Sequence, residues 1–366
     1  MKVVVACGGT GGHAFPGLAV AEELRRRGHE VTVWDSGRDV ESSVMRRWTG
    51  DIFSTGAKQL SLKNLFSIAR SFFRCRKEMR RSRPDVLLAM GSYSSLPPVM
   101  AARVCGVPVV LHEANTVPGR AVEFLSRYAK AVAVSFDMTA KYLPHARTVR
   151  TGLPIRADIA RGKRFPQIPE RAFTVFVTGG SQGAHAVNCL ASEALVLVAN
   201  ELRSRGAGAR PLYVIHQTGE KDEGGVIATY MKAGIDARVN AFENEMANAF
   251  ASADIVIARA GASTCFELAA CGRPALLIPL PSALRNHQHY NAEAFSALRA
   301  ADEGIQSELT PHQIAKYLIS KCDNPQRLVE MSARIRSCSV PDADSRVADL
   351  VEKYARRTVG LSGALK

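Results

Sequence analysis

The chain has 366 residues, 46% of them hydrophobic, which is enough for two domains of ordinary size, each with its own core. Its longest apolar runs, such as residues 86–90, fall far short of the roughly 20 residues that a membrane-spanning helix needs, and we expect no signal peptide. The formal charge of +14 indicates an anionic partner: a phosphorylated substrate, a membrane surface or a nucleic acid. We therefore expect a cytoplasmic protein without a spanning segment.

Short apolar runs alternate with helical patterns along the chain, which is typical of parallel sheets covered by helices on both faces. In the first half, strands are predicted at residues 2–6, 30–34, 85–90, 107–111 and 130–135. A stretch of mixed charge with several prolines, residues 153–171, interrupts this pattern. The pattern then restarts, with strands predicted at 173–178, 211–219, 236–242, 254–261 and 274–280.

The sequence therefore predicts an α/β protein in three segments. Residues 1–157 form an N-terminal Rossmann-like domain, residues 158–340 form a second one, and residues 341–366 form a C-terminal helix and tail. Two such domains, with parallel sheets that face each other across a cleft, are the simplest architecture, because ligands bind at the carboxyl ends of the strands.

Each half opens with a glycine-rich turn between its first predicted strand and a helix. The first glycine loop is "GGTGG", residues 8–12, and the second glycine loop is "GGSQG", residues 179–183. Backbone amides at such a turn can bind a phosphate group. Glycines that serve only a tight turn would explain one such loop better than two.

A dinucleotide-binding fingerprint is an alternative interpretation of the first glycine loop. Gly9, Gly11 and Ala14 have the G-x-G-x-x-A spacing, and Asp35 ends the next predicted strand, as in an NAD-dependent dehydrogenase. His13 at the turn into the helix, and the presence of a second glycine loop, argue against this interpretation.

The most specific stretch is residues 258–281, where small residues separate a strand from a helix. The start of that helix could hold a diphosphate, and Glu267 follows Ser263 and Thr264 by about one turn, where it could bind the two ribose hydroxyls. A capping box is the alternative role for this glutamate. Downstream polar side chains suit neutral sugar hydroxyls, although they would also suit a plain polar loop: Asn286, His287, Gln288 and Asn291.

Together with other motifs, these stretches resemble the MurG glycosyltransferases of bacterial peptidoglycan synthesis. The matching stretches occur in the family's order along nearly the whole chain: "GGTGGHAFPGLAVAEEL", "PDVLLAMGSYSSLP", "HEANTVPGRA", "TGLPIR", "GGSQGAHAVN", "RAGASTCFELAACGRPALLIPLP" and "NHQHYNA". The resemblance implies a GT-B fold and an inverting, metal-independent transfer of N-acetylglucosamine from UDP-N-acetylglucosamine to an undecaprenyl-diphosphate-linked acceptor lipid (lipid I), which forms lipid II.

The resemblance also implies that the enzyme is peripheral on the cytoplasmic face of the inner membrane and that nucleic acid is not a partner. A GT-B glycosyltransferase that acts on diacylglycerol is the nearest alternative, and a dehydrogenase or a basic nucleic-acid-binding module are more distant ones. No cofactor is implied.

The matching motifs carry over the family's site residues. The donor would be bound by Thr10, Gly11, Gly12, Arg156, Ser181, Ala262, Ser263, Thr264, Glu267 and Gln288. The acceptor would be bound by Gly8, Gly9, Gly91, Ser92, His112, Glu113 and Asn115. Two positions depart from the family pattern, because Val122 stands where the family has Asn and Ala114 where it has Gln.

His13 is the candidate catalytic residue. A histidine with an ordinary pKa of about 6.5 is substantially neutral in the cytoplasm, so it can take a proton from the attacking acceptor hydroxyl. The alternative is a histidine at a helix start that is hydrogen-bonded to backbone.

No metal site is predicted. The eight cysteines form no CxxC pair and no zinc-type grouping with histidine, so we expect reduced, structural thiols. Asp342 and Asp344 have the DxD spacing of other glycosyltransferases, but they open the predicted C-terminal helix, where aspartate serves as a cap.

Residues 60–83 predict an interfacial helix on anionic lipid, which would make the N-terminal domain the membrane-associating one as well as the acceptor-binding one. Apolar residues recur at helical spacing: Leu62, Leu65, Phe66, Ala69, Phe72 and Phe73. Basic residues follow or flank them: Arg70, Arg74, Arg76, Lys77, Arg80, Arg81 and Arg83. The alternative is an ordinary amphipathic helix whose apolar face packs on the core.

Overall fold

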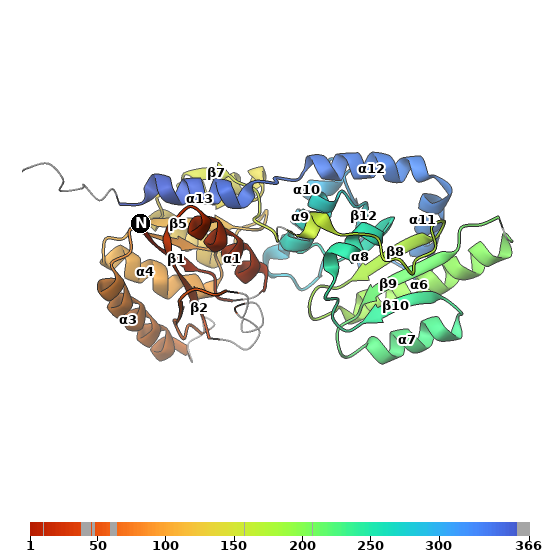
Figure 1. The fold of residues 1–366 in the computed structure, drawn as a ribbon, viewed down its shortest axis with the longest axis horizontal. Helices are drawn as coiled ribbons and strands as arrows, with labels where there is room; N and C mark the ends of the chain where they lie inside the picture. The colour runs from red at the N-terminus through yellow and green to blue at the C-terminus, as the bar shows by residue number, and fades with distance from the viewer. Residues whose placement is uncertain are drawn as a thin grey trace, which may run out of the picture. The chain divides into compact units, whose positions relative to one another are not determined.

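The computed structural model describes residues 1–9, 11–37, 45, 48–58, 64–156, 158–206 and 208–356. The chain divides into two α/β units (Figure 1). The first unit comprises Met1–Arg156 together with the residues from Asp342 onward, and the second unit comprises Ala157–Pro341. The chain therefore leaves the first unit after Arg156 and returns to it at Asp342.

The first unit is built on a sheet of parallel strands. Its strands are β1 (Lys2–Ala6), β2 (Glu30–Asp35), β3 (Ile52–Ser54), β4 (Val86–Ala89), β5 (Val109–Glu113), β6 (Ala131–Val134) and β7 (Thr148–Arg150). Their order in the sheet is β3-β2-β1-β4-β5-β6-β7. Because side chains alternate along a strand, Val3 and Val5 enter one hydrophobic core while Val4 and Ala6 enter another on the opposite face. Burial on both faces explains why the strands are continuous apolar runs.

Helices cover both faces of this sheet. They are α1 (Gly11–Arg26), α3 (Leu65–Ser82), α4 (Leu96–Val104), α5 (Arg120–Leu125) and α13 (Ala343–Tyr354). Residues of α1 and α13 share one core, and residues of α3 and α4 share the other. Short 3₁₀ segments lie between them: η2 (Tyr93–Ser95), η3 (Ser126–Tyr128) and η4 (Asp137–Tyr142).

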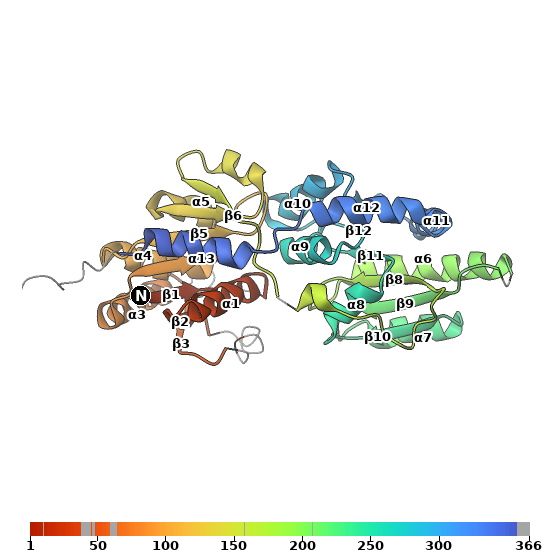
Figure 2. The same cartoon turned by 45° about the horizontal axis from the view of Figure 1, so that its top comes forward.

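The C-terminal helix α13 packs beside α1, a packing that was not predicted from the sequence (Figure 2). Arg27, just after α1, holds it: its guanidinium lies 2.6 Å from Asp349 and 3.0 Å from Glu352. His29 lies 2.8 Å from Glu352 as well. Apolar residues of α13 complete the core on this face of the sheet.

The second unit repeats the plan. Its strands are β8 (Phe173–Thr178), β9 (Leu212–Gln217), β10 (Asp236–Asn240), β11 (Ile255–Ala258), β12 (Ala275–Leu277) and β13 (Asp302–Glu303), in the order β10-β9-β8-β11-β12-β13. Its helices are α6 (His185–Ser204), α7 (Glu223–Lys232), α8 (Met246–Ser252), α9 (Ala262–Cys271), α10 (His287–Ser296), α11 (Pro311–Asp323) and α12 (Pro325–Ser337). The 3₁₀ segments are η5 (Ile159–Arg161) and η6 (Leu284–Asn286).

Both sheets have a topological switch point at their first strand. β1 lies between β2 and β4, and β8 lies between β9 and β11. Ligands of doubly wound folds bind at the carboxyl ends of the strands at such a point. Each glycine loop follows the strand at the switch point, so the predicted Rossmann-like character of both halves is confirmed.

The strands predicted from the sequence are all present, and three others were missed. The missed strands β3, β7 and β13 are three, three and two residues long, and each lies at an edge of its sheet. Among the helices that the structure describes, none has both the length and the apolar character needed to cross a membrane.

Candidate functional site

The first two residues of the first glycine loop are tightly enclosed, whereas Gly11 is half-buried and Gly12 exposed. Gly8 and Gly9 are buried, and Gly9 has φ +131°. A Cβ at Gly8 would lie 2.6 Å from the backbone nitrogen of Ser36, and one at Gly9 would lie 2.6 Å from Oγ of Ser92. Only glycine therefore fits at either position. The predicted donor residue Thr10 lies outside the described residues.

The loop after β4 is joined to the first glycine loop. The Ser94 hydroxyl donates a hydrogen bond to the Gly8 carbonyl oxygen. Gly91 has φ +86° and Ser92 has φ +69°, a region that costs energy for a residue with a side chain. The structure thus brings together the predicted acceptor residues Gly8, Gly9, Gly91 and Ser92 at the switch point of the first sheet.

His13 is the third residue of α1 and is half-buried. A Cβ placed on Gly91 would lie 3.7 Å from Cδ2 of His13 and 3.2 Å from both Val122 and the His112 carbonyl oxygen. His13 therefore lies beside the predicted acceptor residues of the loop after β4. The side chain of His112 is buried, and this burial lowers its pKa to about 4, an effect that the charge of His13 reinforces. His112 is consequently neutral at physiological pH.

Glu113 organises the loop that follows β5. Its carboxylate accepts hydrogen bonds from the backbone N–H of Asn115 at 2.9 Å and of Gly119 at 3.0 Å, and from the Asn115 amide at 3.2 Å. Burial raises the pKa of Glu113, although these hydrogen bonds act in the opposite direction. Two predicted acceptor residues, Glu113 and Asn115, are thus bonded to each other within this loop.

Arg156, a predicted donor residue, belongs to the first unit. Its guanidinium carbon lies 5.5 Å from the centroid of the Phe15 ring, which is a cation–π contact. Phe15 follows His13 by two residues on α1.

The second glycine loop is more open than the first. Gly179 and Gly180 are half-buried, whereas Ser181 and Gln182 are exposed. The Gln217 side-chain amide, at the end of β9, donates a hydrogen bond to the Gly180 carbonyl oxygen. The predicted donor residue Ser181 is therefore exposed on a loop whose backbone is fixed from the neighbouring strand.

A network of buried hydrogen bonds lies beneath this loop. The Asn188 amide nitrogen donates to the Thr218 carbonyl oxygen at 2.8 Å, and a Cβ on Gly183 would collide with that same oxygen. The Asn188 amide oxygen lies 3.1 Å from Nε2 of His216, whose Nδ1 lies 2.8 Å from the Tyr230 hydroxyl. Burial lowers the pKa of His216 to about 3, so the imidazole stays neutral. None of these contacts was predicted from the sequence.

Helix α9 begins at the switch point of the second sheet. Gly261 occupies its N-cap position and carries no side chain to cap it, while Ser263 and Thr264 are its second and third residues. The capping-box alternative for Glu267 is therefore wrong, because the serine and threonine lie inside the helix. Glu267 is half-buried one turn further along, on the helix whose positive end faces the loop.

Two buried side chains, Arg259 and Asn291, fix the loops around α9. The role of Arg259 was not predicted, and Asn291, which was considered for sugar hydroxyls, is buried and bonded to backbone. The Arg259 guanidinium, only 8% exposed, donates to the carbonyl oxygens of Ile278 at 3.1 Å and Pro279 at 3.0 Å. The Asn291 amide, fully buried, donates to the Ala260 carbonyl oxygen at 3.1 Å. Arg259 thereby connects the β11 loop with the loop that leads to α10.

Gln288 lies in the first turn of α10 and is half-buried. Its amide oxygen accepts a hydrogen bond from the Leu280 backbone N–H at 2.9 Å. The contact fixes which end of the amide faces the loop, so the nitrogen is the end that can donate to a ligand.

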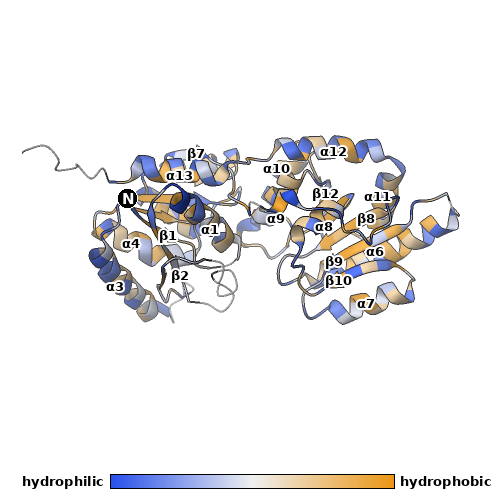
Figure 3. Ribbon diagram, viewed as in Figure 1, coloured by the Kyte–Doolittle hydropathy of each residue, from blue (hydrophilic) through white to orange (hydrophobic). Residues whose placement is uncertain are grey.

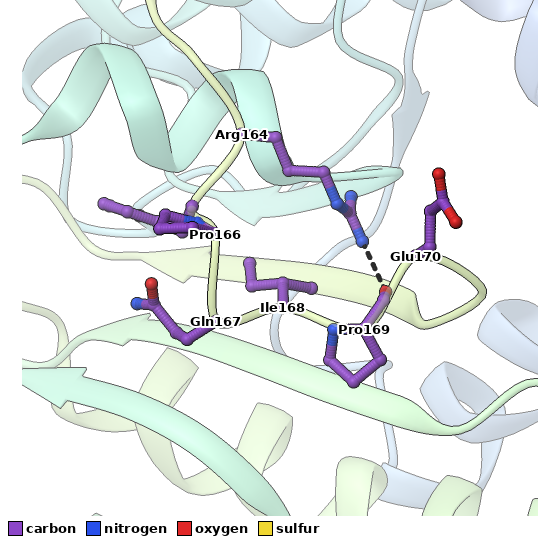
Figure 4. Close-up of a pocket in the computed structure, with 7 residues that line it drawn as sticks. Arg164, Pro166, Gln167, Ile168, Pro169 and Glu170 are labelled. Carbon is purple, nitrogen blue, oxygen red and sulfur yellow. Dashed lines mark hydrogen bonds between the residues drawn. The ribbon is translucent and has the colours of Figure 1, made fainter.

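The pocket shown in Figure 4 is not the predicted site. It has a volume of about 410 Å³ and is lined by residues 164–170, where Arg164 donates to the Pro169 carbonyl oxygen at 3.0 Å. This segment directly precedes β8, so it lies at the amino ends of the strands, opposite the glycine loop. None of the predicted site residues lines it.

The Asp342–Asp344 pair is part of the start of α13. Asp342 holds the N-cap position, and its carboxylate pairs with Arg346 at 3.0 Å instead of capping the helix. Within the described ranges, no group of three or more His, Cys, Asp or Glu side chains is arranged to hold a metal ion.

Comparison with known proteins identifies the family. The N-terminal domain model of glycosyltransferase family 28 matches residues 3–134, and the C-terminal domain model of the same family matches residues 174–350. The first model lies within the first unit, and the second covers most of the second unit and continues into α13, which packs on the first unit. This match favours a UDP-sugar glycosyltransferase over a dehydrogenase.

Curated relatives and a solved structure are similar over the whole chain. A protein of Geotalea uraniireducens is 35% identical over 95% of this chain and 97% of its own length. One of Rhodospirillum rubrum is 37% identical over 98% and 93%. Both are named UDP-N-acetylglucosamine--N-acetylmuramyl-(pentapeptide) pyrophosphoryl-undecaprenol N-acetylglucosamine transferase. The crystal structure of Acinetobacter baumannii MurG is 30% identical, with a TM-score of 0.78, and covers 96% of this chain and 99% of its own.

The solved MurG structure and the two parallel sheets confirm the predicted GT-B fold. With both family models matched in order and relatives similar from end to end, the chain belongs to glycosyltransferase family 28 and, within it, to the MurG glycosyltransferases.

Proposed function

We propose that this enzyme transfers N-acetylglucosamine from UDP-N-acetylglucosamine to undecaprenyl-diphosphoryl-N-acetylmuramoyl-peptide, lipid I, and releases lipid II and UDP. The observation that carries the proposal is the similarity over 95% of the chain to relatives named for this reaction. The separate glycine loops at two switch points are consistent with two phosphate-bearing substrates.

The donor nucleotide is assigned mainly to the second unit's loops. Arg156 of the first unit, which the matching motif assigns to the donor, supplies a cation for the diphosphate, and Thr10, Gly11 and Gly12 are assigned to the donor sugar. The amides of the second glycine loop and of the start of α9 suit the diphosphate, with Ser181 exposed beside it. Glu267 accepts hydrogen bonds from the ribose hydroxyls, and Gln288 donates to the sugar through its amide nitrogen. Ala262, Ser263 and Thr264 supply the first turn of the helix.

The acceptor is assigned to the loops after β1, β4 and β5 in the first unit. His13 takes the proton of the attacking hydroxyl as its oxygen bonds to the anomeric carbon. The bond from that carbon to the donor phosphate breaks, and UDP leaves with the electron pair, so the configuration inverts. The transition state is oxocarbenium-like, as in glycoside hydrolysis.

Attachment to the membrane is assigned to α3. One face of this helix is buried through Ser71, Cys75 and Met79, so the core-packing alternative holds for that face. Of the predicted apolar residues, Phe72 packs on the core, whereas Phe66 and Phe73 are 84% and 61% exposed. Leu62 lies outside the described residues. The exposed stripe combines two phenylalanines and an alanine with basic side chains along the helix and at its C-cap: Phe66, Ala69, Arg70, Phe73, Arg74, Lys77, Arg80, Arg81 and Arg83.

This stripe suits an anionic bilayer, and α3 is among the most hydrophilic helices of the molecule (Figure 3). Each basic residue near such a surface contributes about 1 kcal/mol of binding. We expect the triple change of Arg80, Arg81 and Arg83 to Ser to weaken co-sedimentation with phosphatidylglycerol vesicles roughly tenfold or more. Because Arg81 also pairs with Glu78 at 2.8 Å, we expect it to contribute the least of the three to vesicle binding.

The matched control removes the same charge from exposed positions of the second unit, Lys221, Lys232 and Arg327. Sedimentation that falls equally in both triple variants would show that net charge alone attracts the protein. Unchanged sedimentation of the α3 variant would reject this surface.

An acceptor assay tests the whole proposal. Purified enzyme with labelled UDP-N-acetylglucosamine is supplied in parallel with lipid I and with diacylglycerol in the same detergent. We expect label to appear in a disaccharide lipid with lipid I only. Transfer to diacylglycerol would establish the alternative acceptor.

A further inference from the structure

Phe15 contacts two parts of the candidate site, the first glycine loop and Arg156, which the sequence motifs did not connect. On one side, a Cβ on Gly11, in the first glycine loop, would lie 3.6 Å from the edge of its ring. On the other side, the guanidinium carbon of Arg156 lies 5.5 Å from its centroid. The ring is half-buried and packs against the core of the first unit, which fixes its position.

A guanidinium over an aromatic ring is attracted to the negative face of the ring, and its N–H donors point outward in its own plane. The donors that point away from the ring can bind a phosphate while the cation–π contact is kept. The stack also removes much of the rotational freedom of a long side chain, which would otherwise be lost when the ligand binds.

We propose that Phe15 is a positioning residue for the donor, because its ring holds the Arg156 guanidinium ready for the diphosphate of UDP-N-acetylglucosamine. This inference rests on the proposed function, which makes Arg156 a ligand of the donor. It adds an aromatic residue on α1, beside His13, to the residues that determine donor affinity.

The test compares three single variants of the full-length enzyme and the double variant Phe15→Leu/Arg156→Ala. Phe15→Leu keeps an apolar side chain but removes the aromatic face, Phe15→Tyr keeps the face, and Arg156→Ala removes the cation. The measurements are calorimetric Kd for UDP, and KM for UDP-N-acetylglucosamine and kcat with lipid I in excess.

We expect Phe15→Leu to raise Kd for UDP and KM for the donor between about twofold and tenfold, which matches the usual strength of a half-exposed cation–π contact. The value of kcat should change less than KM. Phe15→Tyr should bind UDP as the wild type does. In the Arg156→Ala background, Phe15→Leu should cause no further loss of affinity, because the stack is already absent.

Tyr128→Leu is the matched control. This residue carries a similar stack, with the Arg103 guanidinium carbon 4.3 Å from its ring, but it precedes β6 and so lies at the amino ends of the strands. Its loss should leave Kd for UDP unchanged.

Two results would overturn the inference while the donor site stands. One is normal UDP affinity of Phe15→Leu beside weakened affinity of Arg156→Ala. The other is an equal loss from Phe15→Leu with and without Arg156, which would show a packing effect. Normal UDP affinity in Arg156→Ala but not in Glu267→Ala would remove Arg156 from the donor site and with it the role of Phe15. Normal affinity in all of these variants, including Glu267→Ala, would instead reject the proposed donor site.

Discussion

The two glycine loops share a sequence pattern and a place at a switch point, but their surroundings differ. In the first loop Gly8 and Gly9 are buried, and the Gly8 carbonyl oxygen is occupied by Ser94 from the loop after β4. In the second loop Ser181 and Gln182 are exposed, and Gln217 holds the backbone from behind. The start of the first loop is therefore enclosed, four residues before His13, whereas the second loop is open to solvent.

The sharpest test of this difference is His13→Ala. If the first loop serves the reaction and the second the nucleotide, turnover should fall by about 10²–10⁴-fold, the usual contribution of a general base. Kd for UDP should stay near the wild-type value. Turnover and UDP calorimetry on the same preparation measure both effects. A collapse of UDP affinity would reverse the assignment of the loops.

The proposal that the second unit binds the nucleotide is tested by Glu267→Ala. Loss of hydrogen bonds between a carboxylate and the ribose should cost about 1.5–3 kcal/mol, so that Kd for UDP and KM for the donor rise roughly ten- to a hundredfold. Glu170→Ala is a control that removes an exposed carboxylate at the amino ends of the strands, outside the proposed site. Calorimetry that finds unchanged UDP affinity in the Glu267 variant would reject this role.

A third test compares the rigidity of the loops. Alanine at Gly8 meets the backbone of Ser36, so Gly8→Ala should cost about 2–3 kcal/mol of unfolding free energy, as overpacking does. At Gly180 nothing lies within 4 Å, and only its φ of +89° opposes alanine, so Gly180→Ala should cost about 1 kcal/mol.

Thermal unfolding measures both glycine variants. Gly28→Ala serves as the control, because Gly28 has φ +85°, open space around it and a place outside the site. Equal losses of stability at Gly8 and Gly180 would contradict the distinction between an enclosed loop and a solvent-exposed one.

The smallest expected effect concerns the buried histidines near the two loops, His112 and His216. Their pKa values, about 4 and about 3, lie below the ordinary value, so the unfolded chain takes up protons first as the pH falls. Stability should therefore fall from pH 7.5 to 5.5 by about 1 kcal/mol for each histidine. His112→Gln and His216→Gln should each flatten this dependence in calorimetric melts. A dependence that stays as steep would show that other groups cause it.

Long buried strands were predictable from the sequence, and short edge strands were not. β1 and β8 are apolar runs because both faces are covered, whereas β3, β7 and β13 are too short to show a periodic pattern. The two glycine loops were predictable because each directly follows one of these long buried strands, β1 or β8.

The contacts that fix the loops around the candidate site were not predicted from the sequence. Ser94 bonds to Gly8, 86 residues away, because their strands are neighbours in the sheet, which no local pattern reveals. Gln217 and Arg259 likewise act on loops of adjacent strands. For Glu267, the sequence allowed a capping role or a ligand role, and only the position of the helix start excluded the cap.

The return of the chain to the first unit has a consequence for biosynthesis. Val347 and Val351 of α13 belong to the same hydrophobic core as Val3 and Val5 of β1. On the ribosome, this core stays incomplete until the whole second unit has been made, whereas the second unit is continuous and contains all of its own strands. The half of the protein that is synthesised first is therefore the half that finishes folding last, and its exposed strands must be kept from aggregation in the meantime.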